Sequence, residues 1–347
     1  MEYDQLFADF GIAPLQLVIG LGIGLIFGLG AALSQFCIRN MVNEVSHRQI
    51  GRASTTWILG ASAAYLFATL LLGSEATDIS EASSLSSDAS ISGPIIGGLL
   101  FGMGMIVSRG CSSRLLILTA HGNMRAPVTL LAFAFSAQLV YGGQLAQTRL
   151  DIQSWWSFTG DSILLPELLS IPTMVFTSIA LATFLACIYM LARRHAWSKI
   201  VGATLVGVAV AAGWASTAFV SFHTFGEIAP QSITFTAPMA ETISTLMTAE
   251  QSLMRLGVGL IIGVLFGSLL VSVWRRDWRL ESFDSKRPLS RYLLAGCMMG
   301  VGAVLAGGCS IGAGLSGTSV LSSQAIITLL AMIGGGLIAL KLGFAKG

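Results

Sequence analysis

Long apolar segments separated by short polar loops make up most of the chain. About 20 apolar residues cross the hydrocarbon core of a bilayer as a helix, and by that measure the sequence predicts nine membrane-spanning helices. They are expected over residues 12–38, 56–73, 93–110, 126–148, 171–192, 200–220, 253–274, 292–308 and 323–345. We therefore predict an all-α, polytopic membrane protein that forms one integral membrane domain over residues 1–347.

The charges of the loops alternate along the chain. Cytoplasmic loops carry an excess of Lys and Arg, and here loops rich in these residues alternate with loops poor in them. The first loop has Arg39, Arg48 and Arg52, whereas the second, over 74–92, is rich in Ser and acidic residues and has no Lys or Arg. The N-terminus is therefore predicted to lie outside the cell and the C-terminus in the cytoplasm.

Composition supports this class and argues against others. Hydrophobic residues make up 54% of the chain and charged residues 10%, whereas soluble domains carry about a quarter charged residues. A net charge of +2 without a basic run gives no sign of a nucleic-acid partner. The first ten residues are acidic, the wrong charge for a secretory leader, so we do not expect a cleaved signal peptide.

The cysteines do not form a disulfide or metal pattern. They are odd in number, contain no CxxC pair and have no His at metal-ligand spacing, which argues against a disulfide framework and a closed zinc site. We expect no cofactor, no metal and no enzyme activity, and no phosphate-binding loop (GxxxxGKS/T) is present. The five are Cys37, Cys111, Cys187, Cys297 and Cys309.

The chain contains an internal repeat. The segments 101–113 and 299–311 superpose without gaps at an offset of 198 residues. The superposition pairs Gly102 with Gly300, Gly104 with Gly302, Gly110 with Gly308, and Cys111 with Cys309. The run Thr-Leu-Leu-Ala at 129–132 recurs at 328–331, one residue off that offset.

The repeat predicts the architecture. It relates a first four-helix half, 12–148, to a second, 200–345, and leaves 171–192 as an unpaired connector. The positive-inside assignment gives the halves opposite orientations. Inverted repeats of this kind occur in many transporters, with the substrate site near the midplane between the halves. We therefore predict a 4+1+4 inverted repeat.

A glycine–cysteine motif, GxGxxxxxxC, occurs three times and ends at Cys37, Cys111 and Cys309. Around the last two cysteines the sequence predicts a helix that ends at glycine and a short re-entrant helix that Ser112 or Ser310 caps. A broken helix at membrane depth is tolerated where it lines a cavity, and its free N–H groups form an anion site. Gly110 and Gly308, next to the cysteines, are expected to support the break.

The motif cysteines are candidates for a substrate path. A thiol is a weak donor and a weak acceptor, and in apolar surroundings it stays neutral. Three such thiols offer an anion successive weak hydrogen bonds that still permit release. The alternative is that each is a small packing residue, which we prefer for Cys187 and Cys297. Arg109 is a candidate for attracting an anion, with anchoring at the lipid surface as the equal alternative.

The segments RGCSSR at 109–114 and GGCSIGAG at 307–314, together with Cys37, resemble the YeeE/YedE family of sulfur-transport membrane proteins. The resemblance implies uptake of thiosulfate across the inner membrane, with the three motif cysteines relaying the ion. It also implies a small cytoplasmic sulfur-carrier partner of the TusA type. The loop 74–92 and the outer segment 149–170 have no match in the family, and no role is assigned to the outer segment 221–252.

Three functional alternatives remain open. One is a carrier for another sulfur or selenium anion, and the second is a membrane thiol oxidoreductase, which needs two cysteines within disulfide reach. The third is a structural helix bundle, in which the cysteines are silent. The energy source and the oligomeric state are not determined by the sequence.

Overall fold

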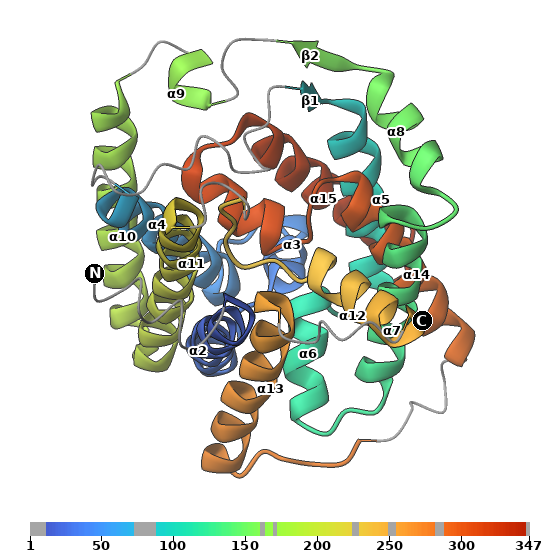
Figure 1. Ribbon diagram of the computed structural model, residues 1–347. Coiled ribbons are helices and arrows are strands. Elements are labelled where there is room, and N and C mark those ends of the chain that lie inside the picture. The colour runs from blue at the N-terminus through green and yellow to red at the C-terminus, as the bar shows by residue number, and fades with distance from the viewer. Residues whose placement is uncertain are drawn as a thin grey trace.

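The computed structural model describes residues 12–72, 88–159, 164–168, 172–223, 229–248, 255–281 and 288–344 (Figure 1). The long helices are α2 (Ile12–Ser34), α4 (Arg52–Leu72), α5 (Ser92–Val107), α7 (Arg125–Tyr141), α10 (Thr173–Arg193), α11 (Trp197–His223), α13 (Leu256–Arg275), α14 (Leu289–Leu305) and α15 (Ser323–Lys341). Shorter helices are α3 (Ile38–Ser46), α6 (Ser112–Ala120), α8 (Ala146–Ser154), α9 (Leu165–Leu168), α12 (Thr236–Thr248), the π-helix η2 (Gly312–Gly317) and the 3-10 helix η3 (Thr318–Val320). The strands β1 (Asp88–Ser90) and β2 (Ser157–Thr159) pair antiparallel.

The predicted α-helical, polytopic membrane class is confirmed, because each expected segment contains one long helix. In the described part of the chain, seven helical spans are long and apolar enough to cross a membrane, or eight if α7 and α8, bent by 70°, count as one. Two of these spans, Ala13–Ser46 and Ser92–Ala120, contain a break at a motif cysteine. Helix α14 is apolar but has only 17 residues, so the count of nine stays a prediction.

Glycine allows α2 and α13 to lie side by side (Figure 1). Gly20, Gly24 and Gly28 follow one another at one-turn spacing along α2. A Cβ atom at any of them would meet a backbone carbonyl of α13. Helices in membranes associate through close packing of small residues, because lipid gives no hydrophobic drive between them. This face of α2 therefore packs against α13.

One packing arrangement occurs in both parts of the chain. Gly98 of α5 meets Thr328 and Ala331 of α15, and Gly296 of α14 meets the same residue types in the run 129–132 of α7. The two glycines differ by 198 in residue number (296 − 98). The two Thr-Leu-Leu-Ala runs, 129–132 and 328–331, therefore each pack against a glycine of a neighbouring helix.

Helix α10 lies at the edge of the molecule, beside α4 and α11 (Figure 1). Only 11% of its most apolar 18-residue stretch is buried within the protein. Cys187 is an exception, because it packs with Leu59 and Ala203 in a small cluster. The helix occupies the predicted connector 171–192, whose connecting role stays a prediction.

The main apolar core lies between the long helices and includes Cys111 and Cys309 together with residues of α3 and α6. Phe27, Phe101, Phe133 and Phe235 are fully buried there, and the rings of Phe27 and Phe235 lie 5.6 Å apart. Helix α3 lies near the centre of the picture in Figure 1. Of the loop over 74–92, residues 74–87 lie outside the described chain, as do 224–228 and 249–252 of the outer segment 221–252.

Candidate functional site: three cysteines at helix breaks

Three helices that contain the motif end with the same backbone turn. The residue two positions before each motif cysteine has a left-handed conformation: Gln35 (φ 56°), Arg109 (φ 62°) and Gly307 (φ 75°). The N–H group of the following residue then bonds the carbonyl five positions earlier, at 2.8 to 3.1 Å. This is the Schellman arrangement that terminates helices. Side chains rarely adopt this conformation, so its recurrence at Gln35 and Arg109 marks a required helix end.

Each motif cysteine then starts the next helical turn. The cysteine carbonyl accepts the N–H of the residue four positions later, at 3.3 Å for Cys37, 2.9 Å for Cys111 and 2.9 Å for Cys309. Cys37 and Cys111 are the N-cap residues of α3 and α6. The expectation that Ser112 or Ser310 caps the short helix is therefore wrong. Cys111 takes the cap position before α6, and Ile311 precedes η2.

The three cysteines are buried, with relative exposures of 5%, 1% and 0% for Cys37, Cys111 and Cys309. The thiol of Cys111 lies 3.3 Å from the Ser113 hydroxyl, within electrostatic range of Cys37 and close enough to Ser310 to interact with it. The Gly312 N–H donates to the Cys309 sulfur at 3.5 Å. The three breaks therefore approach one another within the core, whereas Cys297 is exposed and Cys187 lies in a separate cluster.

Buried donors that the protein does not fully satisfy follow the cysteines. Ser112 Oγ, Ser310 Oγ and Arg39 Nε are buried and form no hydrogen bond of standard geometry within the described residues. Each lies one or two positions after a motif cysteine. Buried polar atoms are nearly always satisfied by protein, water or ligand. These atoms therefore point to a ligand or water beside the thiols.

Basic residues gather where α2 ends. Arg39 lies within electrostatic range of Arg109 and Arg125. Lys199 donates to the Ser34 carbonyl at 3.1 Å and Arg275 to the Leu33 carbonyl at 3.1 Å, which stabilises the C-terminus of the helix. Only Arg109 among them was expected at the site. No short-range pattern points to the others, because they come from four separate segments.

Two cavities border the residues around Cys309. A cavity of about 300 Å³ is bordered by Gly308 and Gly312, on either side of the Cys309 thiol in sequence. A second, of about 650 Å³, shares Gly307 and Gly312 with it. The open space borders the glycines on both sides of Cys309, while the cysteine itself is fully buried behind them.

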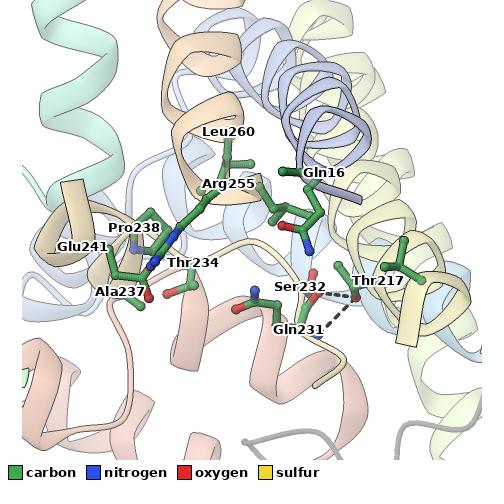
Figure 2. A pocket seen from close by; sticks show the side chains of 14 residues that line it. Gln16, Thr217, Gln231, Ser232, Thr234, Ala237, Pro238, Glu241, Arg255 and Leu260 are labelled. Carbon is green, nitrogen blue, oxygen red and sulfur yellow. Dashed lines mark hydrogen bonds and ion pairs between the residues drawn. The ribbon is translucent and has the colours of Figure 1, made fainter. Parts of the chain in front are cut away.

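A further cavity, of about 270 Å³, lies beside the start of α2 and α13 (Figure 2). Figure 2 shows Arg255 and Glu241 on one side of it and Gln16 and Thr217 on another. The guanidinium of Arg255 forms an ion pair with Glu241 at 3.4 Å. None of the motif cysteines lines this cavity or the other two, and this one also lacks the glycines that flank Cys309.

Comparisons with known proteins agree with the resemblance seen in the motifs. A family model described as Sulphur transport matches residues 33–338. The chain is also similar to the thiosulfate transporter TsuA of Escherichia coli (strain K12), with 24% identity over 260 residues that cover 70% of this chain and 71% of the relative. The matched range begins just before Cys37 and continues beyond Cys309. Because the family model spans most of its length, this multi-pass membrane protein belongs to the sulphur transport family.

Proposed function

We propose that the protein carries thiosulfate across the cytoplasmic membrane into the cell, along a path that passes Cys37, Cys111 and Cys309. One observation carries the proposal: three helices stop at the same left-handed turn, and each presents a buried cysteine at the start of a short helix. The name of the similar TsuA protein supports thiosulfate as the substrate. The same geometry suits related sulfur or selenium oxyanions.

Thiols and helix N-termini together suit transient binding of an anion. The first N–H groups of a helix have no intrahelical partner and attract negative charge. A neutral thiol adds a weak hydrogen bond, and weak successive sites allow both entry and release. Ser112 and Ser310 add donors that no described group of the protein occupies fully. An anion that leaves Cys309 can therefore exchange its hydrogen bonds at Cys111 and Cys37 without a tight intermediate.

The 4+1+4 inverted repeat provides the frame for this path. In the proposed repeat, the helices α2, α4, α5 and α7 of the first half, 12–148, correspond to α11, α13, α14 and α15 of the second, 200–345. The packed pair α2 and α13 then corresponds to the pair α11 and α4, and the pair α5 and α15 corresponds to α14 and α7. All four pairs are packed in the structure, which supports the proposed repeat.

We further propose that the N-terminus faces the outside and the C-terminus the cytoplasm. The basic group around Arg39, Arg109 and Arg125 then lies on the cytoplasmic side, as the positive-inside rule requires. An anion that passes the thiols meets this positive charge on its way out. A small TusA-like sulfur carrier is the proposed acceptor there, on the basis of the family resemblance.

A thiol oxidoreductase remains the second candidate because Cys37 and Cys111 approach each other. That function requires a reactive thiolate, which iodoacetamide modifies rapidly at neutral pH. The carrier requires neutral, buried thiols that react slowly. Labelling rates of the purified protein therefore separate the two candidates.

The proposal predicts that Cys37→Ala, Cys111→Ala or Cys309→Ala abolishes uptake of radiolabelled thiosulfate in cells that lack other sulfur importers. Each substitution removes one relay thiol while it leaves the helix ends in place. The matched control is Cys187→Ala, which removes a buried cysteine outside the motif. Immunoblots verify equal amounts in the membrane.

Normal thiosulfate-dependent growth of the motif variants would refute the relay. Equal loss in the Cys187 control would point to unfolding instead. Competition with unlabelled sulfate, sulfite and selenite defines the anion class that the path accepts.

A further inference from the structure

The cavity of about 300 Å³ that borders the glycines flanking Cys309 is called the vestibule here. Its wall includes Gly307, Gly308 and Gly312 around the Cys309 turn, and the segment 231–237 before and at the start of α12. Helix α8 contributes Arg149 and Gln153. An anion in this space is therefore adjacent to the first backbone groups of the Cys309 break.

The vestibule carries an uncompensated positive charge. Among its lining residues, all in the described part of the chain, Arg149 alone is charged. The neighbouring cavity of Figure 2 is different, since Arg255 there is paired with Glu241. A low-dielectric wall strengthens the field of an unpaired charge. Of these two cavities, only the vestibule is electrostatically suited to an anion.

Two donors in the vestibule are left without partners. Arg149 Nε and Thr236 Oγ1 are buried and make no hydrogen bond to any described residue, and Thr236 as a whole is 5% exposed. Two serines of the wall are satisfied by the protein: Ser232 donates to the Val210 carbonyl at 2.6 Å and Ser316 to the Ile233 carbonyl at 2.9 Å. Arg149 and Thr236 therefore each give the vestibule a buried donor that a ligand can use.

The Arg149 side chain rests on an aromatic ring, and its helix is tied to α14. The guanidinium lies over the ring of Tyr141, 5.9 Å from the centroid, which is a cation–π contact. One turn further along α8, Gln153 donates to the carbonyl of Leu305 at the end of α14 at 3.3 Å. The bend between α7 and α8 thus turns Arg149 toward the end of the helix that precedes Cys309.

We infer that Arg149 and Thr236 form a capture site for the anion, one step before Cys309 on the path. This inference rests on the proposed thiosulfate transport. Thiosulfate is a divalent tetrahedral anion, so it can accept a charge-assisted hydrogen bond from Arg149 and a second bond from the Thr236 hydroxyl. The site concentrates the ion outside the thiols and passes it to the Gly312 N–H and Cys309.

The test compares Arg149→Gln with Arg255→Gln, which removes the same charge from the neighbouring cavity. We expect Arg149→Gln to raise the half-saturating thiosulfate concentration about tenfold, as for loss of one charge-assisted hydrogen bond, with the maximal rate unchanged. Arg149→Lys should retain part of the affinity and Thr236→Val should lose part of it. Arg255→Gln should behave like the wild type.

Calorimetric titration of sodium thiosulfate into the purified proteins measures binding without transport. Equal half-saturation in Arg149→Gln and wild type, or an equal shift in Arg255→Gln, would overturn the capture site while uptake by the wild type still upholds the transport function. Absence of thiosulfate uptake by the wild type would instead refute the function itself. A melting temperature close to that of the wild type verifies that each variant is folded.

Discussion

One or two residues after each motif cysteine lies a serine or arginine with a buried polar atom that forms no standard hydrogen bond among the described residues. Ser112 and Ser310 keep buried hydroxyls without a standard hydrogen bond among the described residues. Ser108, only four positions before Ser112, is bonded to the carbonyls of Gly104 and Gly110 at 2.8 Å each. Two buried serines in the same turn therefore have different tasks, one toward a ligand and one toward the fold.

This contrast predicts separable effects. Ser112→Ala should raise the half-saturating thiosulfate concentration about fivefold and leave the melting temperature unchanged, because its hydroxyl forms no bond that the fold needs. Ser108→Ala should lower the free energy of unfolding by about 1 kcal/mol, because it removes two buried hydrogen bonds at the helix end. Uptake kinetics and thermal melting in detergent measure the two effects. Similar melting losses in both variants would show that Ser112 is structural.

Among the elements, glycine decides which helix faces meet. Gly24 of α2 faces the backbone of α13 at Leu260, whereas nothing lies within 4 Å of a Cβ atom built at Gly22. The two glycines are two residues apart, so they point to different sides of the same helix. One face of α2 is therefore packed and the neighbouring one is open.

We predict that Gly24→Leu destabilises the protein and that Gly22→Leu does not. A leucine at position 24 forces α2 away from α13, at a cost of at least about 2 kcal/mol for overpacking, whereas a leucine at position 22 extends into open space. Fluorescence-detected size-exclusion chromatography after heating gives the apparent melting temperatures. A stable Gly24→Leu variant would mean that the two helices are not in close contact.

On the scale of the whole molecule, the two ends of the proposed path differ in charge and in the cavity beside them. Arg39, Arg109 and Arg125 gather near the first two breaks, while the vestibule opens beside the third. The proposed path thus has a capture end and a more strongly basic end. Its direction follows from which end faces the cytoplasm.

The proposed orientation predicts the reactivity of introduced cysteines. In a chain with the exposed Cys297 replaced by Ser, cysteine at Trp156, which is 64% exposed, should react with an impermeant maleimide in intact cells. Cysteine at Arg48, in the basic loop after α3, should react only after the membrane is opened. The reverse pattern would invert the topology and the direction of the path.

Local sequence patterns were sufficient to predict the long helices and the positions of the helix breaks at the motif. Apolar length predicted one long helix for each segment, and the spacing GxGxxxxxxC marked all three breaks, because a helix end and the residue after it are set by nearby backbone geometry. The caps were predicted wrongly. Serine is the commoner cap, but the Schellman turn ends one residue before the cysteine, which leaves the cap position to the cysteine itself.

The sequence by itself therefore determined the class, the helices, the repeated segments and the three cysteines at helix breaks. Only the tertiary structure decided that the breaks approach one another, that Lys199 and Arg275 hold the end of α2, and that Arg149 stands unpaired beside Thr236. Helix ends depend on bonds within a few residues of chain. Cavities and unpaired donors depend on the packing of segments far apart in sequence, which no local pattern records.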